Sequence, residues 1–207
     1  MLAGLRPLSS RNGRKMDDSE LLALYGEIEA QIESGSYLPY RQVLARTVQE
    51  MGSRTGVTIS DDEGARFAQS LTDWEPFPDT VTGLQELAKR FKLGIISNVD
   101  DDLFAVTREK LKAPFAVVVT AQQVQSYKPA LRNFEEALRR SGLKKEEILH
   151  AAQSVYHDVI PSRSLGIKNV WVNRPSRRPG SGAAKPAVAT PTAEVSSLAE
   201  LVNLLAG

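Results

Sequence analysis

The sequence predicts an α/β fold, with a parallel sheet flanked by helices that follows a purely helical segment. Short apolar runs alternate with amphipathic helical patterns between residues 93 and 173, and this alternation is typical of a parallel sheet covered by helices on both faces. Residues 1–75 show helical periodicity only. Pro76 and Pro78 lie between the two patterns, and two prolines this close cannot occupy a helix interior.

Composition sets limits on function. Among the 207 residues, Lys and Arg number 26 and Asp and Glu number 25, which gives a net charge of +1. This balance argues against binding to nucleic acid or to an anionic membrane, because both need a concentrated basic surface. No apolar run is long enough to span a membrane, and no signal-peptide pattern follows Met1. Cysteine is absent, which excludes disulfides and thiolate chemistry. We expect a cytoplasmic protein.

The helical segment shows two helix-start patterns of the capping-box type. Asp17 is followed three residues later by Glu20, and Ser60 is followed in the same way by Glu63. Gly35, Pro39, Gly52 and Gly56 are the expected breaks between helices. The apolar positions at helical spacing are Leu21, Leu24, Tyr25, Ile28 and Ile32, then Val43, Leu44, Val48 and Met51, then Phe67 and Leu71.

The elements expected after the prolines are a helix over 81–91, a strand over 93–97, a helix over 103–111, a strand over 116–120, a helix over 131–141, a strand over 148–152, a short helix that follows Asp158 and ends at Gly166, and a strand over 169–173. Residues 175–192 are rich in Pro, Gly, Ala and Ser and predict a mobile loop. A last helix is expected over 198–205. We therefore divide the chain into helical residues 1–75, an α/β core over 76–174, and a loop with a terminal helix over 175–207 that completes the core.

Polar side chains follow the predicted strands in a consistent way. They are Ser97 and Asn98 after one strand, Lys128 after the next, and Gln153, Ser154 and Asp158 after the third. Ligands bind at the carboxyl ends of parallel strands, where these loops meet. A hydroxyl, an amide and an ammonium held by a carboxylate suit an oxygen-rich anionic substrate. Taken singly, each residue also fits a turn, a helix start or an N-cap.

Four stretches in order carry a family resemblance: Gly94–Phe104, Ser126–Pro129, Ala152–Asp158 and Val170–Arg174. They resemble the haloacid dehalogenase superfamily of hydrolases and, within it, the type II 2-haloacid dehalogenase-like branch. The similarity covers most of residues 1–174. It implies a Rossmann-like core, with the first helices forming the family's helical cap.

The resemblance also implies roles for the strand-end residues. The family's chemistry passes through a covalent intermediate, in which an aspartate attacks the substrate and water hydrolyses the resulting ester. Lys128 and Asp158 would be catalytic, with Lys128 neutralising charge near the nucleophile and Asp158 orienting Lys128 or the attacking water. The substrate-binding residues would be Ser97, Asn98, Gln153 and Ser154.

The chain departs from the family at the nucleophile. The family carries an Asp-x-x-Gly-Thr motif at the end of its first strand, and none of the ten Asp residues here follows an apolar strand and precedes Gly-Thr. Asp79 comes nearest, and its position favours a helix start. The resemblance makes the missing strand the central one, between the strands at 93–97 and 148–152. We therefore interpret the chain as truncated or mis-started, inactive by the family's route, and either poorly stable or closed by a different strand pairing.

The second departure concerns metal. Superfamily phosphatases usually have an acidic residue where this chain has Gln153, which leaves Asp158 as the only carboxylate of that loop. Mg²⁺ prefers several hard oxygen ligands, so we expect no metal and no cofactor, and Mg²⁺ only if the chain is a phosphatase. The run Asp100–Asp102 is a rival metal site, but helix capping is the favoured interpretation. His157 beside Asp158 could carry a proton, although a structural role is favoured, and His150 is assigned to the core or to a face of the sheet.

The resulting prediction is a hydrolase most like a 2-haloacid dehalogenase, acting on a small anionic organic acid. Two alternatives stay open. One is a small-molecule phosphatase of the same superfamily, and the other is a non-catalytic anion-binding or interaction protein. The oligomeric state also stays open, a homodimer included.

Overall fold

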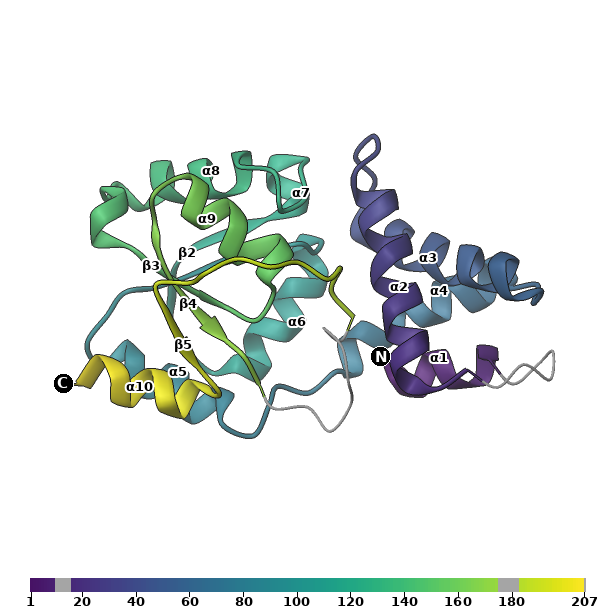
Figure 1. The fold of residues 1–207 in the computed structure, drawn as a ribbon, viewed down its shortest axis with the longest axis horizontal. Coiled ribbons are helices and arrows are strands. Elements are labelled where there is room, and N and C mark those ends of the chain that lie inside the picture. The colour runs from purple at the N-terminus through teal and green to yellow at the C-terminus, as the bar shows by residue number, and fades with distance from the viewer. Residues whose placement is uncertain (10–15, 175–182, 207) are drawn as a thin grey trace. The chain divides into compact units, whose positions relative to one another are not determined.

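The computed structural model describes residues 1–9, 16–174 and 183–206, and the chain divides into two compact units (Figure 1). The helical unit comprises the described residues up to Trp74 together with residues 183–186. The α/β unit comprises the described residues from Glu75 onward, apart from that short segment. Among the described residues, no helix combines the length and apolarity that crossing a membrane requires.

The helical unit forms as its capping patterns predict. Its elements are α1 (Leu2–Ser9), α2 (Asp18–Glu33), α3 (Tyr40–Thr55), α4 (Asp61–Gln69) and the 3-10 turn η1 (Ser70–Asp73). Both capping boxes are confirmed. The Asp17 carboxylate accepts a hydrogen bond from the Glu20 amide at 2.9 Å, and the Glu20 carboxylate accepts from the Asp17 amide at 2.8 Å. Ser60 and Glu63 exchange the same two bonds at the start of α4. Gly56 ends α3 in the left-handed region, with φ of 75°.

The core of the helical unit contains a buried carboxylate among apolar side chains. The fully buried side chains there include Leu5, Tyr25, Ile28, Val43, Leu44 and Val48. Glu29 accepts hydrogen bonds from the Tyr25 hydroxyl at 2.7 Å and the Tyr40 hydroxyl at 2.9 Å. Burial, followed by the charge of Glu29, raises the pKa of both tyrosines well above its ordinary value. Gly26 packs on the 183–186 segment so closely that a Cβ there would lie 2.5 Å from the Ala183 carbonyl oxygen.

The predicted α/β class is confirmed. The elements are α5 (Thr80–Ala88), β1 (Leu93–Ser97), α6 (Asp101–Leu111), β2 (Phe115–Thr120), α7 (Ala121–Val124), α8 (Arg132–Ser141), η2 (Lys145–Glu147), β3 (Leu149–Ala152), η3 (Val155–Val159), α9 (Ile160–Ser164), β4 (Lys168–Val172), β5 (Ala193–Val195) and α10 (Leu198–Ala206). α7 and the three-residue strand β5 were not expected, because neither segment is long enough to show a period. Part of the predicted mobile loop, residues 175–182, lies outside the described residues.

The short helix expected after Asp158 is confirmed as α9, which begins at Ile160 and follows the unpredicted turn η3. The chain already turns at Val155, where the π-helical turn η3 begins, and Asp158 lies inside that turn. Ser154 is the N-cap, and its hydroxyl accepts a hydrogen bond from the amide of His157. The interpretation of Asp158 as a simple N-cap is therefore excluded, and its side chain is free to bond elsewhere.

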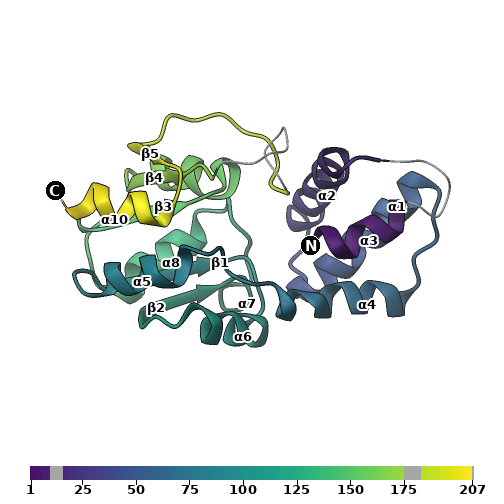
Figure 2. The same cartoon turned by 90° about the horizontal axis from the view of Figure 1, so that it is seen from below.

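The strands form two separate parallel sheets. β1 pairs with β2, and β4 pairs with both β3 and β5. Figure 2 shows β1 and β2 as one group and β3, β4 and β5 as another. No strand of the described residues pairs with the second edge of β1 or of β3. The expected alternative closure, in which the sheet pairs differently, therefore does not occur, and the sheet is open between β1 and β3.

Two helices cover part of the three-stranded sheet. α5 and α10 lie side by side (Figures 1 and 2). Their buried side chains meet those of β4 and β5 in one cluster of Leu87, Val170, Val172, Val195 and Leu201. Each large apolar side chain buried in this way contributes about 1.5–3 kcal/mol to the free energy of unfolding.

Asp79 joins the beginning and the end of the α/β unit. The predicted helix start there is confirmed, because α5 begins at Thr80. The Asp79 side chain, however, accepts bonds from the Arg174 guanidinium at 2.8 Å and from the Leu198 amide at 2.7 Å. The Arg174 guanidinium also lies over the Phe77 ring, 4.2 Å from its centroid. Burial alone would raise the pKa of Asp79, but these two hydrogen bonds outweigh burial and lower that pKa.

We expect Asp79→Asn to loosen α10 selectively. The substitution removes the charge that binds Arg174 and the N-terminal amide of α10, and hydrogen bonds to charged groups contribute about 1.5–3 kcal/mol each. Urea unfolding should show a loss of about 1–2 kcal/mol, and amide hydrogen exchange should accelerate in α10. Asp73→Asn, at an exposed position in η1, is the matched control and should change neither quantity. Equal effects of the two substitutions would contradict this role of Asp79.

Candidate active site

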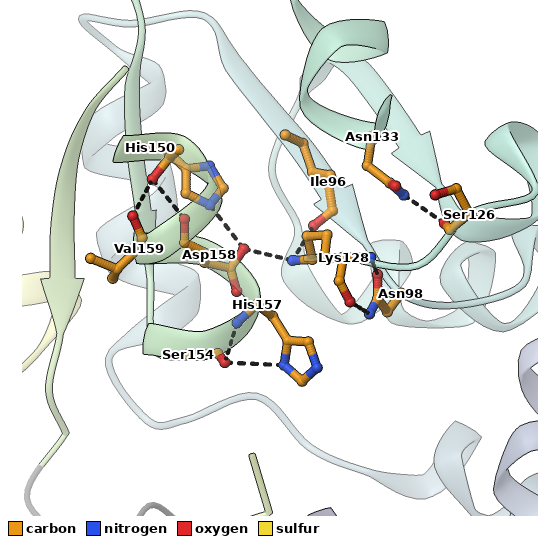
Figure 3. A network of polar contacts seen from close by, with 11 residues as sticks. Ile96, Asn98, Ser126, Lys128, Asn133, His150, Ser154, His157, Asp158 and Val159 are labelled. Atoms are coloured by element: carbon orange, nitrogen blue, oxygen red, sulfur yellow. Dashed lines mark hydrogen bonds and ion pairs between the residues drawn. The ribbon is translucent and has the colours of Figure 1, made fainter. Parts of the chain in front are cut away.

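The candidate site lies at the carboxyl ends of β1 and β3, where three segments of the α/β unit meet (Figure 3). Lys128 comes from the segment between α7 and α8, Asp158 from the turn η3, and His150 from β3 itself. Lys128 and Asp158 are both buried, with 8% and 4% of their surface exposed. The sequence therefore correctly predicts that Lys128 and Asp158 meet, although they lie 30 residues apart.

The Lys128 ammonium connects the two sheets. It donates hydrogen bonds to Asp158 Oδ1 at 2.7 Å and to the backbone carbonyl of Ile96, in β1, at 3.0 Å. Removing both charges from water is costly, and the cost is offset only when the pair is close and its remaining polar atoms are bonded. The short contact to Asp158 and the second bond to Ile96 meet this condition.

Asp158 is held as a carboxylate. Burial opposes its ionisation, but the charge of Lys128 and a hydrogen bond from His150 outweigh burial and hold the pKa of Asp158 well below its usual range. His150 Nε2 lies 2.9 Å from Asp158 Oδ1. Since an ionised carboxylate can only accept hydrogen bonds, Nε2 of His150 must carry the hydrogen.

Asn98 fixes the position of Lys128 through its backbone. The side-chain NH₂ of Asn98 donates to the backbone carbonyl of Lys128 at 3.1 Å, and the side-chain oxygen of Asn98 accepts from the backbone N–H of Lys128 at 2.8 Å. Both ends of this side chain therefore contact the residue that carries the buried charge. This geometry makes Asn98 a positioning residue, whereas its predicted contact with substrate stays a prediction.

The other predicted substrate-binding residues are not bonded to Lys128. Ser97 ends β1, and within the described residues its hydroxyl has no hydrogen-bond partner. Ser154 caps η3, and its hydroxyl lies 3.1 Å from Nδ1 of His157. Gln153 has an exposed side chain, and its backbone carbonyl accepts from the Trp171 indole at 2.9 Å. Their roles in substrate binding stay predictions.

His150 is the site residue that the sequence does not reveal. The assignment to the core accounts for its packing, because its ring lies edge-on to Phe134 with the centroids 5.1 Å apart. It misses the hydrogen bond to Asp158. The available signal was a single ionisable side chain inside the short apolar strand β3, eight residues before the buried acid.

The acidic run after β1 stands at the start of α6, with Asp100 at the N-cap position, but its side chain does not form a capping hydrogen bond. Asp101 accepts hydrogen bonds from Thr120 and Gln123, both at 2.6 Å. Within the described part of the chain, no group of three His, Cys, Asp or Glu side chains is placed to hold a metal ion. Asp158 already accepts from an ammonium and an imidazole, so the residues present do not fit the Mg²⁺ ion that a phosphatase would imply.

We expect Lys128→Met to destabilise the protein far more than Lys89→Met. The two lysines form ion pairs of the same length, 2.7 Å, but Lys89 and Glu86 are exposed. Loss of Lys128 leaves a buried carboxylate without its cation, at a cost of about 3–5 kcal/mol. Loss of an exposed pair costs roughly 0–1 kcal/mol. Urea unfolding at pH 7 measures both changes, and a similar small loss in both variants would contradict a buried charge pair.

Known proteins share both the sequence pattern and the fold. The model of the family described as haloacid dehalogenase-like hydrolase matches residues 31–172. An (S)-2-haloacid dehalogenase from Pseudomonas putida is 27% identical over 174 residues, covering 83% of this chain and 74% of that protein. A glyceraldehyde 3-phosphate phosphatase from Methanothermobacter thermautotrophicus is 35% identical over 101 residues, covering 47% of this chain and 45% of that protein.

The structural comparison agrees. The structure of an L-2-haloacid dehalogenase from Xanthobacter autotrophicus, with chloropropionic acid covalently bound, superposes with a TM-score of 0.81. The match covers 99% of this chain and 92% of that one at 17% identity, which shows a shared fold. The family model spans well over half of the sequence, and this chain therefore belongs to the haloacid dehalogenase-like hydrolases.

Proposed function

We propose that the α/β unit binds a small 2-haloacid for hydrolytic dehalogenation, with Lys128 as the cation that holds the reacting carboxylates. The observation that carries the proposal is the bonding of the Lys128 ammonium. An ammonium has three N–H groups, and two of them reach Asp158 and Ile96. The third has no partner within the described residues. Ser97, whose hydroxyl is also free within the described residues, follows Ile96 directly in β1.

The proposed reaction needs a carboxylate nucleophile. A carboxylate oxygen attacks C2 of the haloacid, the carbon–halogen bond breaks, and the halide leaves with its electron pair. Water then attacks the carbonyl carbon of the ester, which releases the 2-hydroxy acid, regenerates the carboxylate and yields one proton. Lys128 would stabilise the negative charges that come together at this point.

Asp158 is a poor candidate for that nucleophile. It is buried, and the oxygen for which contacts are seen already accepts from Lys128 and His150. The acidic residues nearest in sequence to β1 stand at the start of α6, where Asp101 is bonded to Thr120. We therefore propose that the 207 residues supply the cation and the anion-binding groups, and that the attacking carboxylate is not among the ten aspartates.

The phosphatase alternative has one observation in its favour, which is the match to a glyceraldehyde 3-phosphate phosphatase over about half of the chain. A buried ammonium would also suit a phosphate group. The poor fit of Mg²⁺ to the residues present favours the haloacid. A non-catalytic anion-binding protein would use the same groups and would show binding without any turnover.

The test uses (S)-2-chloropropionate as the ligand. Thermal unfolding measures its binding, and chloride release measures its hydrolysis. We expect a saturable rise in Tm, because a ligand at 100 times its Kd stabilises the folded state by about 2.7 kcal/mol. Ser97→Ala should reduce the rise without affecting folding, and Lys128→Arg should alter it, since the longer planar guanidinium cannot reproduce the bonds of the ammonium. Lys89→Met is the control and should behave as the unmodified chain.

Three outcomes separate the candidate functions. Stabilisation by 2-chloropropionate without chloride release is the expected result for the unmodified chain. Chloride release by the chain alone would show that one of its own aspartates reaches the substrate. Stabilisation by glyceraldehyde 3-phosphate with Mg²⁺-dependent phosphate release would favour the phosphatase, and no response to either anion would overturn the site.

A further inference from the structure

A surface pocket of about 350 Å³ lies in the α/β unit beside the first residues of β4. Sites for small molecules span roughly 300–1,000 Å³. The described lining consists of Arg163, residues 166–169 and residues 190–192. Lys168 begins β4 and Val172 ends it, so the pocket lies roughly 13 Å along the strand from its carboxyl end. It shares no residue with the candidate active site, which occupies the carboxyl ends of the strands.

Hydrogen bonds within the chain fix one wall of this pocket. Asn169, which is only 2% exposed, exchanges two bonds with Thr192. The Asn169 backbone N–H donates to the Thr192 hydroxyl at 3.2 Å, and the Thr192 backbone N–H donates to the Asn169 side-chain oxygen at 3.1 Å. The Arg163 guanidinium also donates to the Thr190 carbonyl at 2.6 Å. The wall over 190–192 is therefore held against β4 at two separate points.

Three cationic side chains meet at this pocket. Arg163 and Lys168 belong to its lining. Lys145 reaches the same place from η2, because a Cβ built on Gly166 would lie 3.1 Å from the Lys145 Nζ. Within the described residues, neither lysine ammonium has a hydrogen-bond or ion-pair partner. Arg163 uses one of its five N–H groups on Thr190, so most of its donors remain available to a ligand.

No acidic side chain balances these charges within the described part of the chain. The described lining contains no Asp or Glu. The acids nearest to Lys145 in sequence are Glu146 and Glu147, both exposed, and Glu147 accepts a hydrogen bond from the Lys144 backbone N–H at 2.8 Å. A concave surface lined by charges of one sign concentrates ions of the opposite sign. The pocket therefore favours an anionic ligand.

We propose that this pocket binds a phosphate group, either free or carried by a small organic molecule. A phosphate monoester has a charge of about −1.5 to −2 at pH 7 and three strong acceptor oxygens. Three cations match that charge, whereas a single guanidinium would suffice for a monocarboxylate. The Thr192 hydroxyl, which accepts from Asn169, has no acceptor for its own hydrogen within the described residues and is available to a phosphate oxygen. This binding does not depend on the proposed function.

The experiment titrates inorganic phosphate into the whole chain at constant pH and ionic strength and follows the backbone amide signals by two-dimensional NMR. We expect saturable shifts in residues 166–169 and at Thr192. Chloride at the same ionic strength should not produce them. Shifts of the same size with chloride would overturn a phosphate site, and so would shifts confined to the surroundings of Lys128, which would place the anion in the candidate active site.

Charge-removing variants test whether the three cations act at this pocket. Lys145→Gln and Lys168→Gln should each raise the Kd for phosphate about threefold, and the double variant about tenfold. Both side chains are exposed, so the Tm without ligand should not change. Lys92→Gln is the matched control, because Lys92 is an exposed lysine that directly precedes β1 and has no part in the pocket. An equal rise in Kd with Lys92→Gln would indicate attraction by net charge alone and overturn the proposal.

Glycerol 3-phosphate separates the two sources of the phosphate group. Ile167 and Pro191 give the pocket an apolar part beside the cations. If an organic group occupies that part, the Kd of glycerol 3-phosphate should be at least about threefold below that of inorganic phosphate. Equal values would assign the pocket to free phosphate and would support the site equally. Absence of saturation with both ligands would overturn the site, whatever the response to (S)-2-chloropropionate.

Discussion

A buried ammonium and a buried carboxylate, 2.7 Å apart, are the contact on which the α/β unit depends. Lys128 reaches the backbone of β1, Asp158 reaches a side chain of β3, and the two strands do not pair. Backbone hydrogen bonds normally hold neighbouring strands of a sheet together. Here side chains join the two sheets at their carboxyl ends, so the stability of the unit and the geometry of the candidate site rest on the same few atoms.

The unpaired edges of β1 and β3 lie where the family resemblance places the nucleophile. The resemblance to haloacid dehalogenases implies a nucleophile at the end of a strand between β1 and β3, and the structure leaves that position without a paired strand from the described residues. The third N–H of Lys128, which has no partner within the described residues, lies at the same end of these strands and would suit a carboxylate acceptor. In our proposal, an anion-binding protein and a hydrolase would differ by one carboxylate at this site. Because the other groups are shared, the sequence alone left both functions open.

Local patterns predicted the elements well, and contacts between distant segments were predicted less completely. The capping boxes at Asp17 and Ser60 and the strands β1 and β2 follow from periods and end signals that lie within each element. The helix after Asp158 was predicted, but the turn η3 before it was not, and its N-cap is Ser154. His150 was missed because its bond to Asp158 exists only after β3 and η3 have packed.

The most direct test of this account is a pH titration of Asp158 in the folded protein. The ¹³C signal of its side-chain carboxyl reports ionisation, and the Asp158→Asn variant assigns that signal. An ordinary aspartate titrates near pH 3.9. We predict that Asp158 stays ionised below that pH, because Lys128 and His150 hold its pKa well below the usual range. The stability that this charge contributes is then fully present above about pH 3.9 and is lost as the pH falls through the folded-state pKa. A midpoint at or above about 3.9 in the folded protein would contradict the buried charge pair as the contact that joins the two sheets.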